Sequence, residues 1–113
     1  MNELLRRYPD GPECIAYTPG VTPDTGLARH GGSDIDAVVA YMNKIGMPVS
    51  TAAYSGAFMA RLCVEDLTAA GWKNGMFINV DKPREASAQS NDLALASELW
   101  EKSDELLIRK LGA

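Results

Sequence analysis

A chain of 113 residues with a net charge of -4 suits a single domain, and its acidity argues against a nucleic-acid or anionic-membrane partner. Apolar residues make up 46% and charged residues 23%, as in compact soluble proteins, and no apolar run is long enough to span a membrane. The first ten residues show no signal-peptide core, and Cys14 and Cys63 form no disulfide pattern. We therefore expect both cysteines to be reduced and the chain to be cytoplasmic.

The first third of the chain predicts a helix and then a strand. Residues 1–8, with apolar Leu4, Leu5 and Tyr8, predict the last part of a helix. The Pro-Asp-Gly-Pro run at 9–12 must end this helix. The apolar run at 13–17 predicts a buried strand, because β-branched and aromatic residues suit a pleated ladder. Residues 18–32 are expected to form a loop.

Two helices are predicted before the next strand. Ser33 can cap the first helix, and Gly46 can end it. Ser50 or Thr51 can start the second, which we expect to run to about residue 70 with Cys63 on its core face. The apolar face of the first helix consists of Ile35, Val38, Val39, Met42 and Ile45.

The last third predicts a strand, a polar loop and a long helix. The strand spans 76–80, the loop spans 81–89, and Ser90 or Asn91 caps the final helix. Two strands joined through helices should run parallel with a right-handed crossover. The fold class is therefore α/β, as one domain over 1–113, and the first strand should keep one ladder edge unpaired within the chain.

The loop after the first strand is the most informative part of the sequence. Pro19 has no amide for a strand ladder, so the strand must end there. Gly20 permits close approach of the backbone to a ligand. Because ligands of open α/β sheets bind beyond the carboxyl ends of strands, we expect this loop to form the edge of a nucleotide-binding site. The alternative is an ordinary Pro-Gly turn.

Four segments resemble the short-chain dehydrogenases/reductases. They are ELLRRYP at 3–9, CIAYTPG at 14–20, TGL at 25–27 and ASELWEKS at 96–103. The first three are similar to the end of the catalytic helix, the next strand and the Pro-Gly loop beside the nicotinamide. The tail and the spacing of Thr25 are most similar to the branch of protochlorophyllide reductase and retinol-dehydrogenase-like enzymes. The resemblance implies the C-terminal part of a Rossmann-like doubly wound fold.

That resemblance also implies a cofactor, NADP or NAD. Pro19, Gly20 and Val21 would lie against the nicotinamide, and the Thr25 hydroxyl would bond its carboxamide. Residues 28–47 would form a flap over a small-molecule substrate in a complete protein. The oxidoreductase reaction would transfer hydride to or from a carbonyl, an alcohol or an activated double bond.

The family's catalytic and phosphate-binding motifs are missing from these residues. No Gly-rich phosphate turn occurs, and no tyrosine is followed by lysine four positions later. By the resemblance that lysine would fall about two helical turns before Met1. We therefore assign no catalytic residue and expect the isolated chain to be inactive and to bind the cofactor weakly.

The sequence gives little support for a metal site or another catalytic site. The remaining alternative is a protein that functions by associating with other chains. His30 stands alone in a Gly-rich loop, so no metal site is assigned. Trp100 is expected at a docking edge. If the family resemblance is misleading, the chain is a noncatalytic α/β association module. In either case we expect self-association or docking onto a missing N-terminal half, through the open strand and poorly covered apolar residues.

Overall fold

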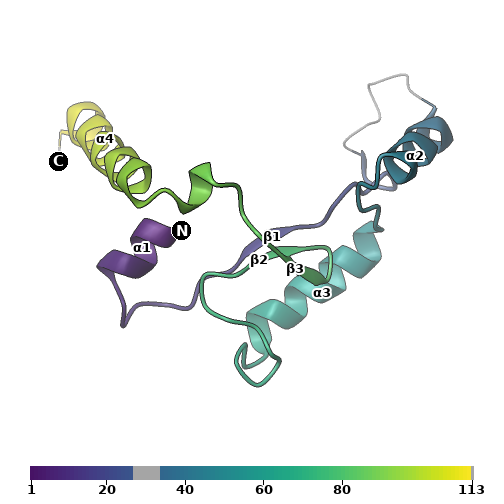
Figure 1. The fold of residues 1–113 in the computed structure, drawn as a ribbon, viewed down its shortest axis with the longest axis horizontal. Helices are drawn as coiled ribbons and strands as arrows, with labels where there is room; N and C mark the ends of the chain where they lie inside the picture. The colour runs from purple at the N-terminus through teal and green to yellow at the C-terminus, as the bar shows by residue number, and fades with distance from the viewer. Residues whose placement is uncertain (27–33, 113) are drawn as a thin grey trace.

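The computed structural model describes residues 1–26 and 34–112 and is a mixed α/β structure with one small sheet. Its strands are β1 (Ala16–Thr18), β2 (Phe77–Asn79) and β3 (Lys82–Arg84), in that order across the sheet (Figure 1). β1 and β2 run parallel, and β2 and β3 run antiparallel. The parallel pair confirms the predicted strand–helix–strand order. A Rossmann-like doubly wound sheet is not established by three such short strands.

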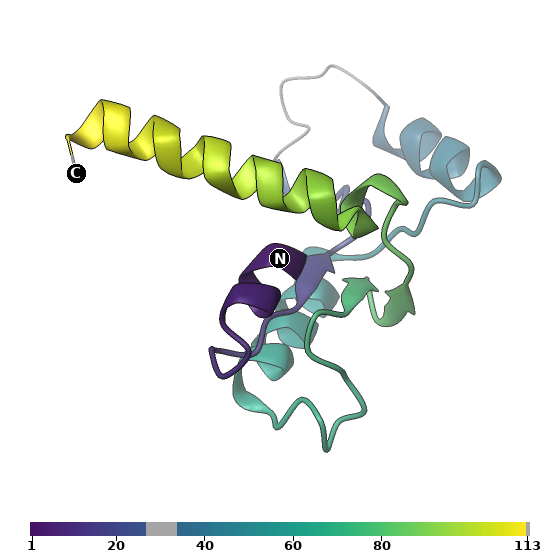
Figure 2. The same ribbon diagram turned by 60° about the vertical axis from the view of Figure 1, so that its left-hand side comes forward.

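The helices are α1 (Asn2–Arg7), α2 (Ile35–Lys44), α3 (Ala52–Val64) and α4 (Leu93–Leu111), and the 3-10 turn η2 (Gln89–Asn91) precedes the last. Figure 1 shows α1 and α4 at one end of the molecule, α2 at the other, and α3 beside the sheet between them. In Figure 2 the C-terminal half of α4 extends away from the remaining elements. No helix among the described residues is long and apolar enough to cross a membrane.

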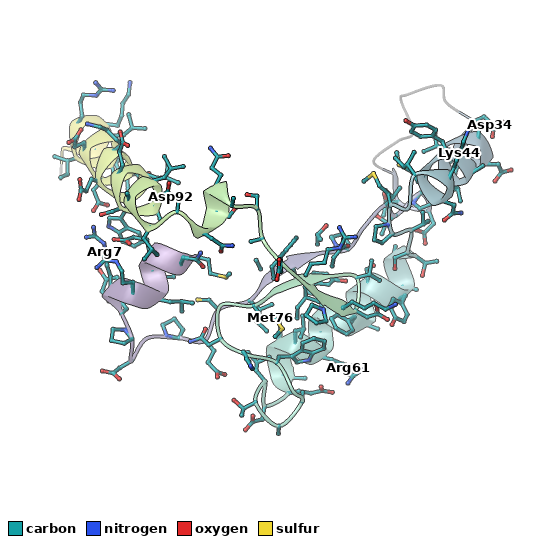
Figure 3. The ribbon with its side chains drawn as sticks, viewed as in Figure 1. Arg7, Asp34, Lys44, Arg61, Met76 and Asp92 are labelled. Carbon is teal, nitrogen blue, oxygen red and sulfur yellow. The ribbon has the colours of Figure 1, made fainter. Side chains whose placement is uncertain are left out.

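Side-chain caps decide where three helices begin. The Asp34 carboxylate accepts the amides of Asp36 and Ala37 at the start of α2, and Asp92 plays the same part at α4 (Figure 3). The predicted caps Ser90 and Asn91 are therefore wrong, because both lie in η2. Thr51 caps α3 as predicted. The other predicted cap, at position 33, lies outside the described residues, as do His30 and part of the expected flap.

Two elements begin or end at other residues than predicted, because side chains accept hydrogen bonds from backbone amides there. β1 begins only at Ala16, since the Cys14 amide donates to Asn74 Oδ1 at 2.7 Å rather than to a strand. α3 ends at Val64 rather than near residue 70. Asp66 starts a separate turn there by accepting the Ala69 amide at 2.8 Å.

The predicted polar loop at 81–89 is also wrong, since it contains β3. Pro83 is tolerated in β3 because this strand lies at the edge of the sheet, where one side of the ladder needs no donor. Cys63, predicted in the core, is exposed. Phe58, rather than Cys63, lies on the face of α3 that meets the sheet, where it stacks on Tyr17.

The core is small and lies between the sheet and α3. Ile78 is fully buried and Leu67 is 7% exposed, and no other apolar residue in the described part of the chain is buried to that extent. Tyr17 of β1 stacks on Phe58 at 5.8 Å between ring centroids, and Trp72 meets Phe58 edge-on at 5.8 Å. The radius of gyration is 17.6 Å, whereas a compact chain of this length would have about 13 Å. Much apolar surface is therefore left without cover.

Candidate ligand-binding site at the carboxyl edge of the sheet

The parallel strands bring their carboxyl ends to one edge of the sheet. Thr18 of β1 lies beside Asn79 of β2, and the Val80 amide donates to the Thr18 carbonyl at 2.8 Å. The Pro19–Thr25 segment follows β1, and the turn into β3 follows β2. Both segments thus start from the edge at which open α/β sheets bind ligands.

Gly20 is the point of closest packing in this region. Its φ of +72° favours glycine, and a Cβ there would lie 2.7 Å from the Pro48 carbonyl oxygen and 2.8 Å from Val80 Cγ2. The close approach for which Gly20 is needed is therefore made to the chain itself. Any contact with a ligand would be made by the opposite side of this residue.

Val21 and Pro19 are held by the segment that leads into α3. The Val21 amide donates to the Pro48 carbonyl at 2.9 Å, and the Ser50 amide donates to the Val21 carbonyl at 2.8 Å. The Pro19 carbonyl accepts the Ser55 hydroxyl at 3.3 Å, and Ser55 is only 5% exposed. The backbone groups of Val21 are thus occupied, so a ligand could meet only its side chain.

Thr25 keeps hydrogen-bonding capacity for a ligand. Its hydroxyl donates to the Thr22 carbonyl at 2.9 Å, which leaves the oxygen lone pairs available as acceptors. Such an acceptor fits the NH2 group of a carboxamide. Next to it, both oxygens of Asp24 lie 2.9 Å from the Ala52 amide, so this loop also caps α3.

A cavity of about 670 Å³ adjoins the loop. Pro48, Val49 and Val80 give it apolar walls, and the polar groups come from the start of α3, the end of β2 and β3. This volume lies within the range of small-molecule sites. The polar lining consists of Ser50, Thr51, Tyr54, Asn79, Asp81, Lys82 and Arg84.

Sequence reasoning missed these lining residues. Ser50 and Tyr54 lie about thirty residues before Asn79 in the chain. The one available signal was that Asn79 closes an apolar strand, where a polar side chain faces the carboxyl edge. The sequence predicts a loop where β3 lies, so nothing in it points to Lys82 and Arg84.

The acidic group of the cavity is hydrogen-bonded within the chain, whereas its two basic groups have no ion-pair partner among the described residues. The Tyr54 hydroxyl donates to Asp81 Oδ2 at 2.7 Å, and this hydrogen bond, followed by burial, raises the pKa of Tyr54 above its ordinary value. Lys82 and Arg84 form no ion pair within the described part of the chain. Asn79 Oδ1 is shielded from solvent and has no hydrogen-bond partner among the described residues. The two cations are therefore open to a ligand, whereas the Asn79 acceptor is covered.

No catalytic constellation accompanies the cavity. Across residues 1–26 and 34–112, no three His, Cys, Asp or Glu side chains gather as metal ligands. The Tyr54 hydroxyl is bonded to the Asp81 carboxylate, and no lysine within the described part of the chain hydrogen-bonds to it. The arrangement can bind and orient a molecule, but the described residues do not form a proton-transfer pair of the expected kind.

Comparison with known proteins gave no match: no family model, no curated protein and no solved structure is significantly similar to this chain.

Proposed function

We propose that this chain supplies the nicotinamide side of an NAD(P)-dependent oxidoreductase of the short-chain dehydrogenase/reductase type, and that it is inactive alone. The observation that carries the proposal is the position of the Pro19–Thr25 loop. The loop leaves a parallel strand at the carboxyl edge of the sheet, and Thr25 retains lone pairs there. The sequence resemblance supports the same assignment.

The four proposed cofactor residues contribute unequally. Thr25 would accept a hydrogen bond from the carboxamide, while Pro19 and Val21 would offer apolar contacts, since their backbone groups are bonded within the chain. Gly20 would shape the loop rather than touch the ring. Bound cofactor would supply hydride chemistry, and these residues would orient its nicotinamide. The remaining machinery would come from a part of the enzyme beyond the outer edge of β1.

The test is a titration of the 15N-labelled chain with nicotinamide mononucleotide, followed by amide chemical shifts. We expect saturable binding near millimolar, with shifts centred on 20–25, because one ring and one hydrogen bond provide about 4 kcal/mol at most. Thr25→Val should weaken binding about fivefold, which corresponds to about 1 kcal/mol for one hydrogen bond. Thr68→Val, at an exposed turn, is the matched control.

Three results would contradict the proposal. They are the absence of shifts in the loop, equal binding by Thr25→Val, and cofactor-dependent turnover by the isolated chain. NADPH itself should show no saturable binding in the micromolar range, because the diphosphate cradle is missing. Sequencing the reading frame before Met1 gives an independent test: in-frame Gly-rich and Tyr-x-x-x-Lys motifs are expected there.

A second function, a noncatalytic association module, is favoured by α4. Leu99 is 68% exposed and Leu111 is 74% exposed, on a helix of 19 residues whose main neighbours among the described residues are α1 and η2. Exposed apolar surface of this kind marks interaction sites. Strong self-association together with no response to nicotinamide mononucleotide would favour this function over the oxidoreductase.

A further inference from the structure

The cavity beside α3 has features that the proposed cofactor does not use. Its lining includes Pro48 and Val80, the two neighbours of Gly20, but no residue of the Pro19–Thr25 loop. Its own polar groups come from α3, the end of β2 and β3. It is therefore a separate place for a ligand, whether or not a nicotinamide binds at the loop.

One residue that lines this cavity has an acceptor without a donor. Asn79 Oδ1 is shielded from solvent and has no hydrogen-bond partner within the described part of the chain. A buried polar atom in this condition carries a free-energy cost, which a donor N–H or O–H would remove. The turn that follows is held in place, since the Val80 amide donates to the Thr18 carbonyl. The Asn79 side chain must therefore rotate before its Oδ1 can meet a ligand in the cavity.

Two cations line the same cavity. Lys82 and Arg84 are two positions apart on β3, so their side chains leave the same face of the strand. Both are exposed, and neither has an ion-pair partner within residues 1–26 and 34–112. The nearest acidic lining residue, Asp81, accepts the Tyr54 hydroxyl at 2.7 Å. The open positions on the cations suit an anionic group.

We propose that this cavity binds a small organic anion, a carboxylate or a phosphate ester, that also carries a hydrogen-bond donor. Lys82 and Arg84 bind the anionic group, the Asn79 side chain rotates so that its Oδ1 accepts the donor, and Pro48, Val49 and Val80 contact the carbon skeleton. A neutral analogue loses the cation contacts, and an analogue without the donor leaves Asn79 unpaired. This recognition does not rest on the proposed oxidoreductase function, so either can fail alone.

The test uses four ring compounds as probes for the full chain, with 15N amide shifts as the readout. They are 4-hydroxybenzoate, 4-hydroxyphenyl phosphate, the neutral 4-hydroxybenzamide, and benzoate, which lacks the hydroxyl donor. At least one of the two hydroxylated anions should bind near millimolar and shift the amides of 79–84. The neutral amide should bind about tenfold more weakly than the preferred hydroxylated anion. If the carboxylate is the preferred anion, benzoate should bind about tenfold more weakly than 4-hydroxybenzoate. The carboxylate and phosphate arms identify the preferred anion.

Variants assign the binding to named residues. The double variant Lys82→Gln/Arg84→Gln should weaken anion binding at least about tenfold, while the double variant Lys73→Gln/Arg109→Gln, at exposed cations outside the cavity, should leave it unchanged. Asn79→Leu should remove the preference for 4-hydroxybenzoate over benzoate. If Asn79→Leu does not fold, the comparison of those two probes on the natural chain still tests the acceptor.

The proposal is overturned if neither anion shifts residues 79–84, if 4-hydroxybenzamide binds as tightly as the anions, or if the Lys82/Arg84 double variant binds normally. Binding that is confined to the Pro19–Thr25 loop would also overturn it, without affecting the oxidoreductase proposal.

Discussion

The region around α3 and the region formed by α1 and α4 are stabilised in different ways. Around α3, an internal stack of Tyr17, Phe58 and Trp72 packs α3 against the sheet, and backbone hydrogen bonds fix the loop beyond β1. Between α1 and α4, the contacts include Tyr8 against Trp100 at 6.3 Å, Arg7 at 5.3 Å from the Trp100 ring centre, and an ion pair of Arg7 with Glu101 at 3.9 Å.

The single buried residue of α1 shows the contrast most clearly. Glu3 is 3% exposed and receives Arg6 Nε at 2.8 Å and Arg7 Nε at 2.6 Å. In this region a charged group is buried, whereas Leu99 and Leu111 remain exposed. The sheet region is thus packed around its own small core, whereas the α1–α4 region combines ion pairs with an exposed apolar face.

The largest expected effect is that of Gly20→Ala. A methyl group there meets Pro48 and Val80 in a left-handed conformation, so we expect a loss of about 3 kcal/mol in the free energy of unfolding. Gly46→Ala is the matched control, because Gly46 has a φ of +71° but no atom within 4 Å of its added Cβ, and it should cost about 1 kcal/mol.

Urea unfolding followed by Trp72 fluorescence, in a Trp100→Phe background, measures both glycine variants. Equal losses for the two glycines would mean that the contacts of Gly20 with Pro48 and Val80 do not matter. The Pro19–Thr25 loop would then be held by some other part of the chain.

Acid should unfold the α1–α4 region first. Hydrogen bonds from Arg6 and then Arg7 lower the pKa of Glu3 from 4.5 to about 2. A carboxyl whose pKa is lower in the folded state stabilises that state above its unfolded pKa. This stabilisation is lost as pH falls from 4.5 toward 2.

Trp100 fluorescence in a Trp72→Phe background should therefore change over this pH range, while Trp72 fluorescence in its own background changes less. Glu3→Gln should remove the pH dependence of the Trp100 signal, and the exposed Glu85→Gln should not. An unaltered transition in Glu3→Gln would show that the Glu3 carboxylate and its ion pairs within α1 do not stabilise this region.

Asp24→Asn should have a smaller effect. It weakens the cap that both carboxylate oxygens give to the Ala52 amide and removes a negative charge from the start of α3, so about 1 kcal/mol should be lost. Asp10→Asn, at an exposed turn, should be neutral. Unfolding in urea, followed by circular dichroism, compares the two, and a neutral Asp24→Asn would show that Thr51 caps α3 sufficiently alone.

The sequence predicted features that depend on neighbouring residues and missed those that depend on distant ones. The parallel pair followed from Pro19 ending the first strand and from the order of the elements. β3 was missed because Lys82, Pro83 and Arg84 have the composition of a loop, and only pairing with β2 makes them a strand. The end of α3 is an exception: the sequence prediction missed it although it depends on a nearby residue, Asp66, whose side chain accepts the Ala69 amide.

The candidate site was predictable only in part for the same reason. The Pro19–Gly20 turn could be placed after a strand, but the partners of Gly20 are Pro48 and Val80, far along the chain. Asn79, Lys82 and Arg84 became a site only through the cavity that they share with Tyr54. The exposure of Cys63 reflects how little of α3 the small sheet covers.

Among the described residues, the outer edge of β1 has no partner strand and is open to one. Ala16 and Thr18 bond to the β2 side, so the alternation of a strand directs the Tyr17 amide to the opposite edge. Amide hydrogen exchange at a concentration where light scattering shows a monomer tests this claim most directly. We predict that Tyr17 exchanges at least about 100-fold faster than the fully buried Ile78. A monodisperse monomer in which Tyr17 is as well protected as Ile78 would contradict the claim, because the chain would then close its own sheet.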